Sequence, residues 1–165
     1  MWLCNSSIGR KVVMSVTGVA LILFLTFHMS MNIAALFSGD AYNMICEFLG
    51  ANWYALVATL GLAALAVIHI LYAFWLTMQN RKARGTERYA VTTRPAGVEW
   101  SSQNMLVLGI IIILGLLLHL FNFWYNMMFA ELTGIAVAHD PADGYAYIVD
   151  TFSCPVYVVL YIVWL

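Results

Sequence analysis

Charged side chains are scarce in this sequence. Asp, Glu, Lys and Arg make up 9% of the 165 residues, whereas 64% are hydrophobic, and the mean hydropathy is +0.87. Soluble domains average about 25% charged residues. The composition therefore excludes an ordinary water-soluble fold and indicates a lipid bilayer as the surroundings of the chain.

Charge is missing altogether from three long segments, residues 12–37, 51–78 and 100–130. Each is long enough to cross about 30 Å of hydrocarbon at 1.5 Å per residue. A fourth apolar segment, 155–165, makes only about 16 Å of helix, half a membrane. A membrane helix that stopped in mid-bilayer would leave its last carbonyls unpaired, so we interpret the sequence as a fragment of a longer protein.

These segments predict an all-α membrane protein, a transmembrane helix bundle with one transmembrane domain over residues 1–165. Three full helices and the first half of a fourth are expected at about 11–37, 51–79, 101–130 and 155–165. The intervening loops are expected at 38–50, 80–100 and 131–154.

Basic residues are absent from two of these three loops. All seven Lys and Arg lie before the first helix or in the loop 80–100, and six of the eight acidic residues lie in the other two loops. By the positive-inside rule, the N-terminus and the loop 80–100 are cytoplasmic and the loops 38–50 and 131–154 are outside. Topology alone explains this distribution, so it favours no nucleic-acid partner.

Cysteine motifs are also lacking. Cys4, Cys46 and Cys154 form no CxxC pair and no cluster with histidine, which excludes the common zinc and iron–sulfur signatures. Cys46 and Cys154 both fall on the predicted outer side, where a disulfide can form. Free thiols are the simpler expectation.

What the uncharged segments do contain is histidine, one in each: His28, His69 and His119. Ionisable side chains are costly inside a membrane and commonly mark a functional site. His28 and His119 each lie 16 residues, about 24 Å of helix, beyond cytoplasmic starts near Val12 and Gln103. These two histidines are therefore predicted to share one level near the outer face.

His69 belongs to the opposite level. Its helix runs inward from about Trp53, so the same 16 residues place His69 close to the cytoplasm. A matching histidine on the fourth helix would fall at roughly residue 168 to 174, beyond Leu165.

Two imidazoles that face each other at one level are a natural ligand set for b-type haem, since neutral imidazole nitrogens can fill both axial positions of the iron. Gly115 and Gly61 would let helices approach a flat macrocycle closely. Asn32, Asn122 and Tyr72, each about one helical turn from a histidine, can hydrogen-bond haem edges or fix a ring tautomer.

Simpler explanations exist for each histidine taken singly, such as a hydrogen bond to a neighbouring helix. The distribution of three histidines over three helices and two levels favours haem ligation. A proton pathway or transport protein would place ionisable groups along a continuous track, and the segments hold no Asp, Glu, Lys or Arg. His139 lies in the polar stretch AHDPADG and is expected to be solvated.

Five stretches carry a family resemblance over essentially the whole chain: NSSIGRKVVMSVTG, FLTFHMSMN, AVIHILYAFW, RKARGTERYAV and GLLLHLFNFWY. As an ordered set they resemble the cytochrome b558 membrane anchor of succinate dehydrogenase and fumarate reductase. The resemblance is to the single-chain, five-helix, two-haem type of bacteria that use menaquinone. It implies a place in the bacterial inner (cytoplasmic) membrane.

The resemblance implies a role for each membrane histidine. His28 and His119 would be the axial ligands of the distal haem b, and His69 would bind the iron of the proximal haem b. The chain departs from the family in lacking the fourth ligand and the fifth helix. Ser15, Thr17 and Trp100 lie near the inner level and can meet the propionates of the proximal haem, although serine and threonine equally bond their own helix backbone.

The partners implied by the resemblance are a flavoprotein with covalent FAD and an iron–sulfur subunit. The flavoprotein interconverts succinate and fumarate, a step of the tricarboxylic acid cycle, so this chain would be non-catalytic for succinate itself. It would carry electrons between menaquinone and the iron–sulfur subunit. The basic loop 80–100 faces the side where that subunit would dock.

Quinone chemistry moves protons together with electrons, so a titratable group is expected near the quinone. Glu47, at the outer start of the second helix, is the best-placed candidate, and a surface carboxylate is the simpler interpretation. A haem b anchor of another oxidoreductase, of the hydrogenase or formate dehydrogenase type, shares the same haem chemistry. Only the resemblance separates that alternative from the first.

Overall fold

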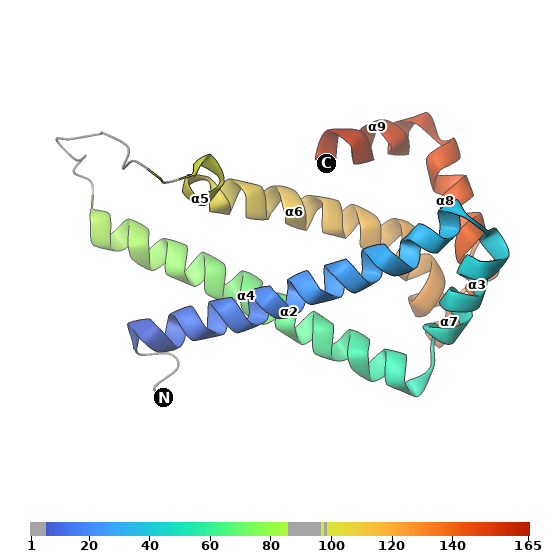
Figure 1. The fold of residues 1–165 in the computed structure, drawn as a ribbon, viewed down its shortest axis with the longest axis horizontal. Coiled ribbons are helices and arrows are strands. Elements are labelled where there is room, and N and C mark those ends of the chain that lie inside the picture. The colour runs from blue at the N-terminus through green and yellow to red at the C-terminus, as the bar shows by residue number, and fades with distance from the viewer. Residues whose placement is uncertain (1–5, 86–96, 98) are drawn as a thin grey trace.

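The computed structural model describes residues 6–85, 97 and 99–165. All secondary structure in this part of the chain is helical, as the composition predicted (Figure 1). In chain order the elements are α2 (Ser7–Asn32), η1 (Ile33–Leu36), α3 (Gly39–Phe48), α4 (Trp53–Arg84), α5 (Trp100–Gln103), α6 (Met105–His119), η2 (Leu120–Phe129), α7 (Ala130–Thr133), α8 (Gly144–Ser153) and α9 (Pro155–Trp164).

Three helical stretches within the described residues are long and apolar enough to cross a membrane. They are Ser7–Leu36, Trp53–Ala83 and Met105–Thr133, which correspond to the three full helices expected from the uncharged segments. Their apolar side chains point outward: Leu23, Val57 and Leu114 are 65%, 63% and 61% exposed. Such a surface is compatible with an apolar solvent and unfavourable in water.

The helices α2 and α4 pack together along an antiparallel crossing (Figure 1). The guanidinium of Arg10 donates a hydrogen bond of 2.6 Å to Oε1 of Gln79 and lies 5.2 Å from the ring centre of Trp75. The start of α2 therefore lies beside the end of α4. This pairing brings the basic residues Arg10, Lys11, Arg81 and Lys82 to one end of the molecule.

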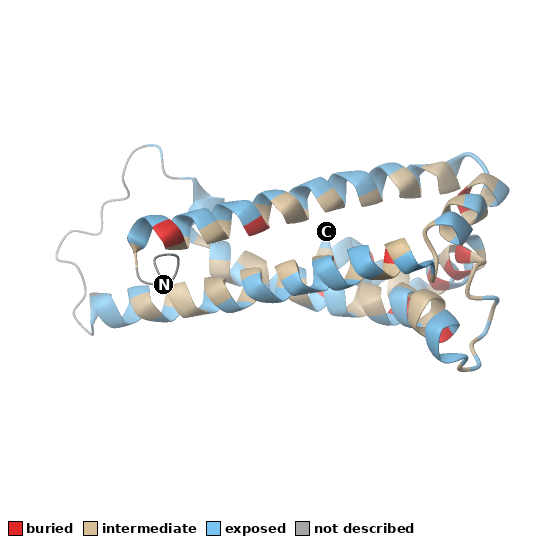
Figure 2. Ribbon diagram, turned by 90° about the horizontal axis from the view of Figure 1, so that it is seen from below, coloured by how far each residue is buried: buried red, intermediate tan, exposed pale blue. Residues whose placement is uncertain are grey.

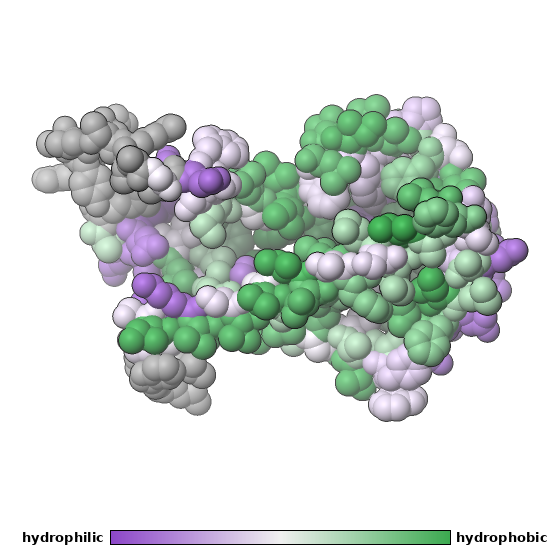
Figure 3. All heavy atoms as spheres, in the orientation of Figure 1, coloured by the Kyte–Doolittle hydropathy of each residue, from purple (hydrophilic) through white to green (hydrophobic). Residues whose placement is uncertain are grey.

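The opposite end is built by α3, α7 and α8, and buried residues gather there (Figure 2). Asn43 of α3 donates to Oδ1 of Asp143 at 2.7 Å, and its own Oδ1 accepts from the backbone N–H of Tyr145 at 2.8 Å. Figure 3 shows hydrophilic residues at both ends and hydrophobic residues between them on the viewed face. The fold thus separates a basic end from an acidic one.

The segments 38–50 and 131–154, expected as loops, contain the helices α3 and α8. The reason is local capping, because Ser38 accepts a hydrogen bond from the backbone N–H of Ala41 at 3.2 Å and Asp143 accepts from Ala146 at 3.0 Å. Short polar residues at a helix N-terminus satisfy its free amides in this way. In the loop 80–100, α4 continues to Arg84 and α5 begins at Trp100; residues 86–96 and 98 lie outside the described part.

The third apolar stretch changes its winding directly after His119. The element η2 is a π-helix of 10 residues, as in the hydrogen bond from the backbone N–H of Ala130 to the carbonyl of Tyr125. The side-chain amide of Asn126 donates to the carbonyls of Phe121 and Asn122, both at 3.0 Å. A side chain that bonds into the backbone ladder favours such an irregularity.

The last apolar segment, α9, is bent by 92° from α8. Cys154 precedes Pro155 and takes the extended backbone (φ −88°, ψ 114°) that proline imposes on the residue before it. Pro155 then occupies the first turn of α9, a position that suits its fixed φ and its missing N–H. At the far end of α9, the indole N–H of Trp164 donates to the carbonyl of Ile111 at 2.9 Å.

Close packing at the acidic end should make Gly144 sensitive to substitution. A Cβ at this position would overlap the thiol of Cys46 and lie 2.9 Å from Met127 Cε and 3.0 Å from Tyr42 Cε1. We expect Gly144→Ala to lower the free energy of unfolding by about 1–3 kcal/mol, since overpacking forces neighbours apart.

The matched control is Gly109→Ala on α6, where a Cβ would meet nothing within 4 Å. Thermal unfolding of the two variants in the same detergent compares them. Equal transition temperatures for the two variants would contradict the packing described at Gly144.

Candidate functional site

His28 and His119 lie on different helices and meet side by side in space. Their ring centres are 5.6 Å apart, and the ring planes are perpendicular. His28 stands on α2 and His119 is the last residue of α6. The structure therefore brings together the two histidines whose depths matched in the sequence.

Aromatic rings flank this pair on both sides. Phe24 stacks on His28 with ring centres 5.4 Å apart, and Phe123 lies 5.1 Å from His119. Each phenylalanine is four residues from its histidine, the spacing that places two side chains on one helix face. Neither was among the site residues predicted from the sequence, although the four-residue spacing was available to find them.

The imidazole nitrogens of the pair have no hydrogen-bond partners among the described residues. Both histidines are half-buried, and polar groups in an apolar surrounding normally find a partner. The missing partners leave both rings free to bind a ligand from outside the chain.

The separation of the two rings is close to, and slightly shorter than, the separation that a shared metal ion would need. Metal–imidazole bonds are about 2 Å long, so two such bonds in line would put the nitrogens about 4 Å apart and the ring centres about 6 Å apart, compared with the 5.6 Å between these ring centres. The described residues hold no group of three or more His, Cys, Asp or Glu able to bind a bare ion. Two ligands suffice only if the ion brings the remaining ligands with it, as haem iron does.

The polar neighbours of the pair bond elsewhere than to the rings. Asn32 donates from Nδ2 to the backbone carbonyl of His28 at 2.8 Å, and its Oδ1 accepts from the hydroxyl of buried Tyr42 at 2.9 Å. Asn122, also buried, donates to the hydroxyl of Tyr161 at 3.3 Å. These contacts fix the helices around the histidines.

The two glycines expected beside a macrocycle differ in their surroundings. A Cβ on Gly115 would overlap the indole of Trp164, so that side chain covers this face of α6. A Cβ on Gly61 would meet nothing within 4 Å. The close approach predicted at Gly115 is thus made by Trp164 of α9.

The third membrane histidine, His69, lies apart from the pair and packs against α2. Its Nδ1 is 2.9 Å from the hydroxyl of Thr17, and its Cε1 would be 3.4 Å from a Cβ on Gly18. Thr17 also donates to the carbonyl of Val13 at 2.7 Å. The sequence analysis named Thr17 but did not identify His69 as its partner.

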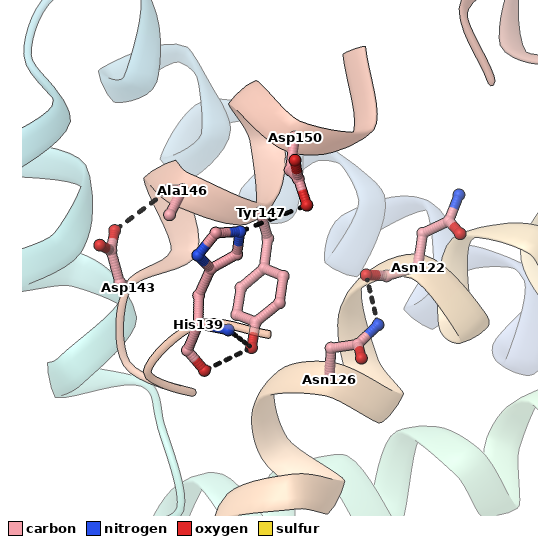
Figure 4. A network of polar contacts seen from close by, with 7 residues as sticks. All are labelled: Asn122, Asn126, His139, Asp143, Ala146, Tyr147 and Asp150. Atoms are coloured by element: carbon pink, nitrogen blue, oxygen red, sulfur yellow. Dashed lines mark hydrogen bonds and ion pairs between the residues drawn. The ribbon is translucent and has the colours of Figure 1, made fainter. Parts of the chain in front are cut away.

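His139 takes part in a polar network at the acidic end, and its side chain remains 35% exposed (Figure 4). Its Nε2 lies 3.3 Å from a carboxylate oxygen of Asp150, and its backbone carbonyl accepts from the hydroxyl of Tyr147 at 2.8 Å. These two contacts, with Asp150 and Tyr147 of α8, hold the segment that contains His139 against that helix. The network drawn in Figure 4 includes neither His28 nor His119.

Glu47, the candidate quinone residue, lies on α3 at the acidic end. It is exposed and lines an open cavity of about 380 Å³. The polar members of that lining are Asp40, Asn43, Glu47, Asp140 and Asp143. The structure thus places Glu47 among other carboxylates at the end of the molecule where α3 meets α8.

Cys46 and Cys154 are both free thiols in the structure. Cys46 lies against Gly144, and burial raises the pKa of its thiol. Burial likewise raises the pKa of the neighbouring Tyr42 hydroxyl, and the nearby Cys46 adds to that rise. Both groups are held in their protonated, uncharged forms.

No protein-family model, curated protein or solved structure matches this chain. A functional assignment therefore depends on the geometry of the described residues and on the motifs that surround the three membrane histidines.

The raised pKa of Cys46 predicts slow alkylation at neutral pH. The thiolate is the reactive form, so the rate should rise with pH through a midpoint above the ordinary cysteine value of about 8.5. Mass spectrometry of iodoacetamide-treated protein over a pH series measures this midpoint, with Cys46→Ser identifying the modified site. A midpoint at or below the ordinary value would contradict the burial of this thiol.

Proposed function

We propose that this chain is the haem b membrane anchor of a succinate:quinone oxidoreductase. The observation that carries the proposal is the contact between the perpendicular rings of His28 and His119, centred 5.6 Å apart with their nitrogens unpartnered in the described chain. The resemblance of the histidine-containing stretches to the b558 family is the reason for proposing this complex rather than another one with haem b.

The proposed orientation places the basic end in the cytoplasm. Arg10 and Lys11 start α2 beside Arg81 and Lys82 of α4, and positive charge is favoured on the cytoplasmic side of a bilayer. The helices α2, α4 and α6 with η2 would span the inner membrane of a bacterium. The acidic end, with α3 and α8, would then face outward, and a fourth span would begin at α9.

In this arrangement His28 and His119 would hold one haem b, the distal one, through their imidazole nitrogens. A bound haem would supply one-electron transfer between its ferric and ferrous states. Phe24 and Phe123 orient the two rings and exclude water from them. Asn32 fixes the backbone at His28 by its hydrogen bond to the carbonyl. His69, in the middle of α4 and beside Thr17 of α2, would bind a second, proximal haem.

Electrons would pass between menaquinone and an iron–sulfur subunit docked at the basic end, and a flavoprotein with FAD would carry out the succinate–fumarate reaction. Glu47 is our candidate for proton exchange with the quinone, since its exposed carboxylate lies at the acidic end. A carboxylate there can release or accept protons directly from water.

Removal of either ligand of the pair should abolish the same haem. We expect His28→Ala and His119→Ala each to remove the distal b-type absorption from reduced-minus-oxidised spectra of the full chain. Alanine has no nitrogen to bind the iron, so each variant would lose one axial ligand. His139→Ala, which changes a histidine at the acidic end, serves as the matched control and should keep the full spectrum. Loss of different haems in the two variants would contradict the pairing, and a parent protein without b-type bands would refute the proposal.

Co-purification identifies the complex. Mild detergent extraction of the tagged chain should yield a flavoprotein with succinate dehydrogenase activity at equal stoichiometry. Recovery of a nickel or molybdenum subunit instead would assign the chain to a hydrogenase or formate dehydrogenase. The spectroscopic test would remain valid in that case, because it depends only on the histidines.

A further inference from the structure

The ring of His69 is held against α2 by two neighbouring residues. The hydroxyl of Thr17 lies 2.9 Å from Nδ1. The ring also lies close to Gly18, where an added Cβ would be 3.4 Å from the ring atom Cε1. Thr17 is 5% exposed, so water does not compete for its hydroxyl. One edge of the imidazole, the edge that carries Nδ1, is therefore in contact with α2.

The hydrogen bonds of Thr17 decide which atom carries the proton. A threonine hydroxyl has one proton to donate and two lone pairs to accept with. Its oxygen lies 2.7 Å from the carbonyl of Val13 and 3.3 Å from the carbonyl of Met14, and a carbonyl can only accept. The hydroxyl proton is thus directed to Val13, which leaves the oxygen as the acceptor of a proton from His69 Nδ1.

A neutral imidazole with its proton on Nδ1 has a free lone pair on Nε2. Nε2 of His69 has no hydrogen-bond partner among the described residues, and the side chain is half-buried. The contacts with α2 therefore turn His69 into a preorganised donor through Nε2.

We propose that Thr17 is the positioning residue of His69: its hydroxyl accepts from Nδ1, fixes the Nδ1–H tautomer, and leaves Nε2 as a ligand atom for the iron of the second, proximal haem. The second part rests on the proposed function; the tautomer does not. Partners at the distant nitrogen of a ligating histidine commonly set its orientation and basicity in this way. The pair of His28 and His119 has no such hydrogen bond in the described chain, so the two levels differ in how they are held.

The test uses Thr17→Val, which keeps the shape of the side chain and removes the hydroxyl, and Thr17→Ser, which keeps the hydroxyl. The matched control is Thr26→Val on the same helix, because Thr26 also bonds its own backbone, to Ile22 at 2.9 Å, and is exposed. The full chain labelled with ¹⁵N-histidine and prepared without haem is studied by NMR. His69→Gln assigns the His69 resonances.

We expect His69 to show a protonated Nδ1 and an unprotonated Nε2 in the parent, Thr17→Ser and Thr26→Val proteins. In Thr17→Val, the ratio of the Nδ1–H to the Nε2–H tautomer should fall about five- to tenfold, the loss of one ordinary hydrogen bond. An Nε2–H tautomer in the parent, or an unchanged ratio in Thr17→Val, would overturn the proposal. Loss of all histidine signals in Thr17→Val would identify misfolding, and the tautomer observed in the unsubstituted protein would then decide the proposal.

A second measurement addresses the ligand atom. Both proteins are loaded with haem. Relative to the unsubstituted protein, Thr17→Val should have a shifted midpoint potential of the proximal haem and an unchanged potential of the haem held by His28 and His119. Equal shifts of both potentials, or no shift, would remove Thr17 from the proximal site. Absence of haem from every variant would instead contradict the proposed function, and the tautomer measurement would stand by itself.

Discussion

The constraint on which the structure depends is that apolar surroundings offer the backbone no hydrogen-bond partner. Each long apolar stretch must satisfy its own amides and carbonyls, and continuous helices do so. Few of the described residues are buried, which is compatible with apolar surroundings, because such surroundings give apolar side chains no reason to leave the surface. Order is instead imposed by polar contacts at chosen points: Arg10 with Gln79 at the basic end, Thr17 with His69, and Asn43 with Asp143 at the acidic end.

Depth along a helix was predictable from the sequence, whereas rotation about the helix axis was not. Counting residues from each uncharged start was enough to match His28 with His119, whose rings do meet. The partner of Thr17 was missed because it depends on the angle at which α2 crosses α4.

Loops 38–50 and 131–154 were expected without helices, since their caps at Ser38 and Asp143 involve single short side chains in otherwise polar segments. A close approach was predictable at Gly115, because a residue without a side chain leaves room for a large neighbour, but the indole that fills this room could not be named from the sequence.

The three membrane histidines are held in two different ways. His28 and His119 are surrounded by aromatic rings and make no hydrogen bond through their nitrogens in the described chain. His69 is tied through one nitrogen to a threonine that is itself tied to the helix backbone. Aromatic packing restricts where a ring can lie, and a hydrogen bond also decides which nitrogen carries the proton. Substitutions of the aromatic neighbours would therefore affect the ring positions of His28 and His119, whereas a substitution of Thr17 would affect the tautomer of His69.

The π-helix η2 has a consequence for how this segment tolerates change in length. An α-helix rotates about 100° per residue, so deleting one residue normally turns everything beyond it to a different face. The wider winding between His119 and Ala130 makes fewer turns than an α-helix of the same number of residues. A return to α-helical winding would therefore make up part of the rotation that is lost when residues are deleted there. The stretch 120–129 can accordingly change in length with less rotation of α7 relative to His119 than an α-helix would allow.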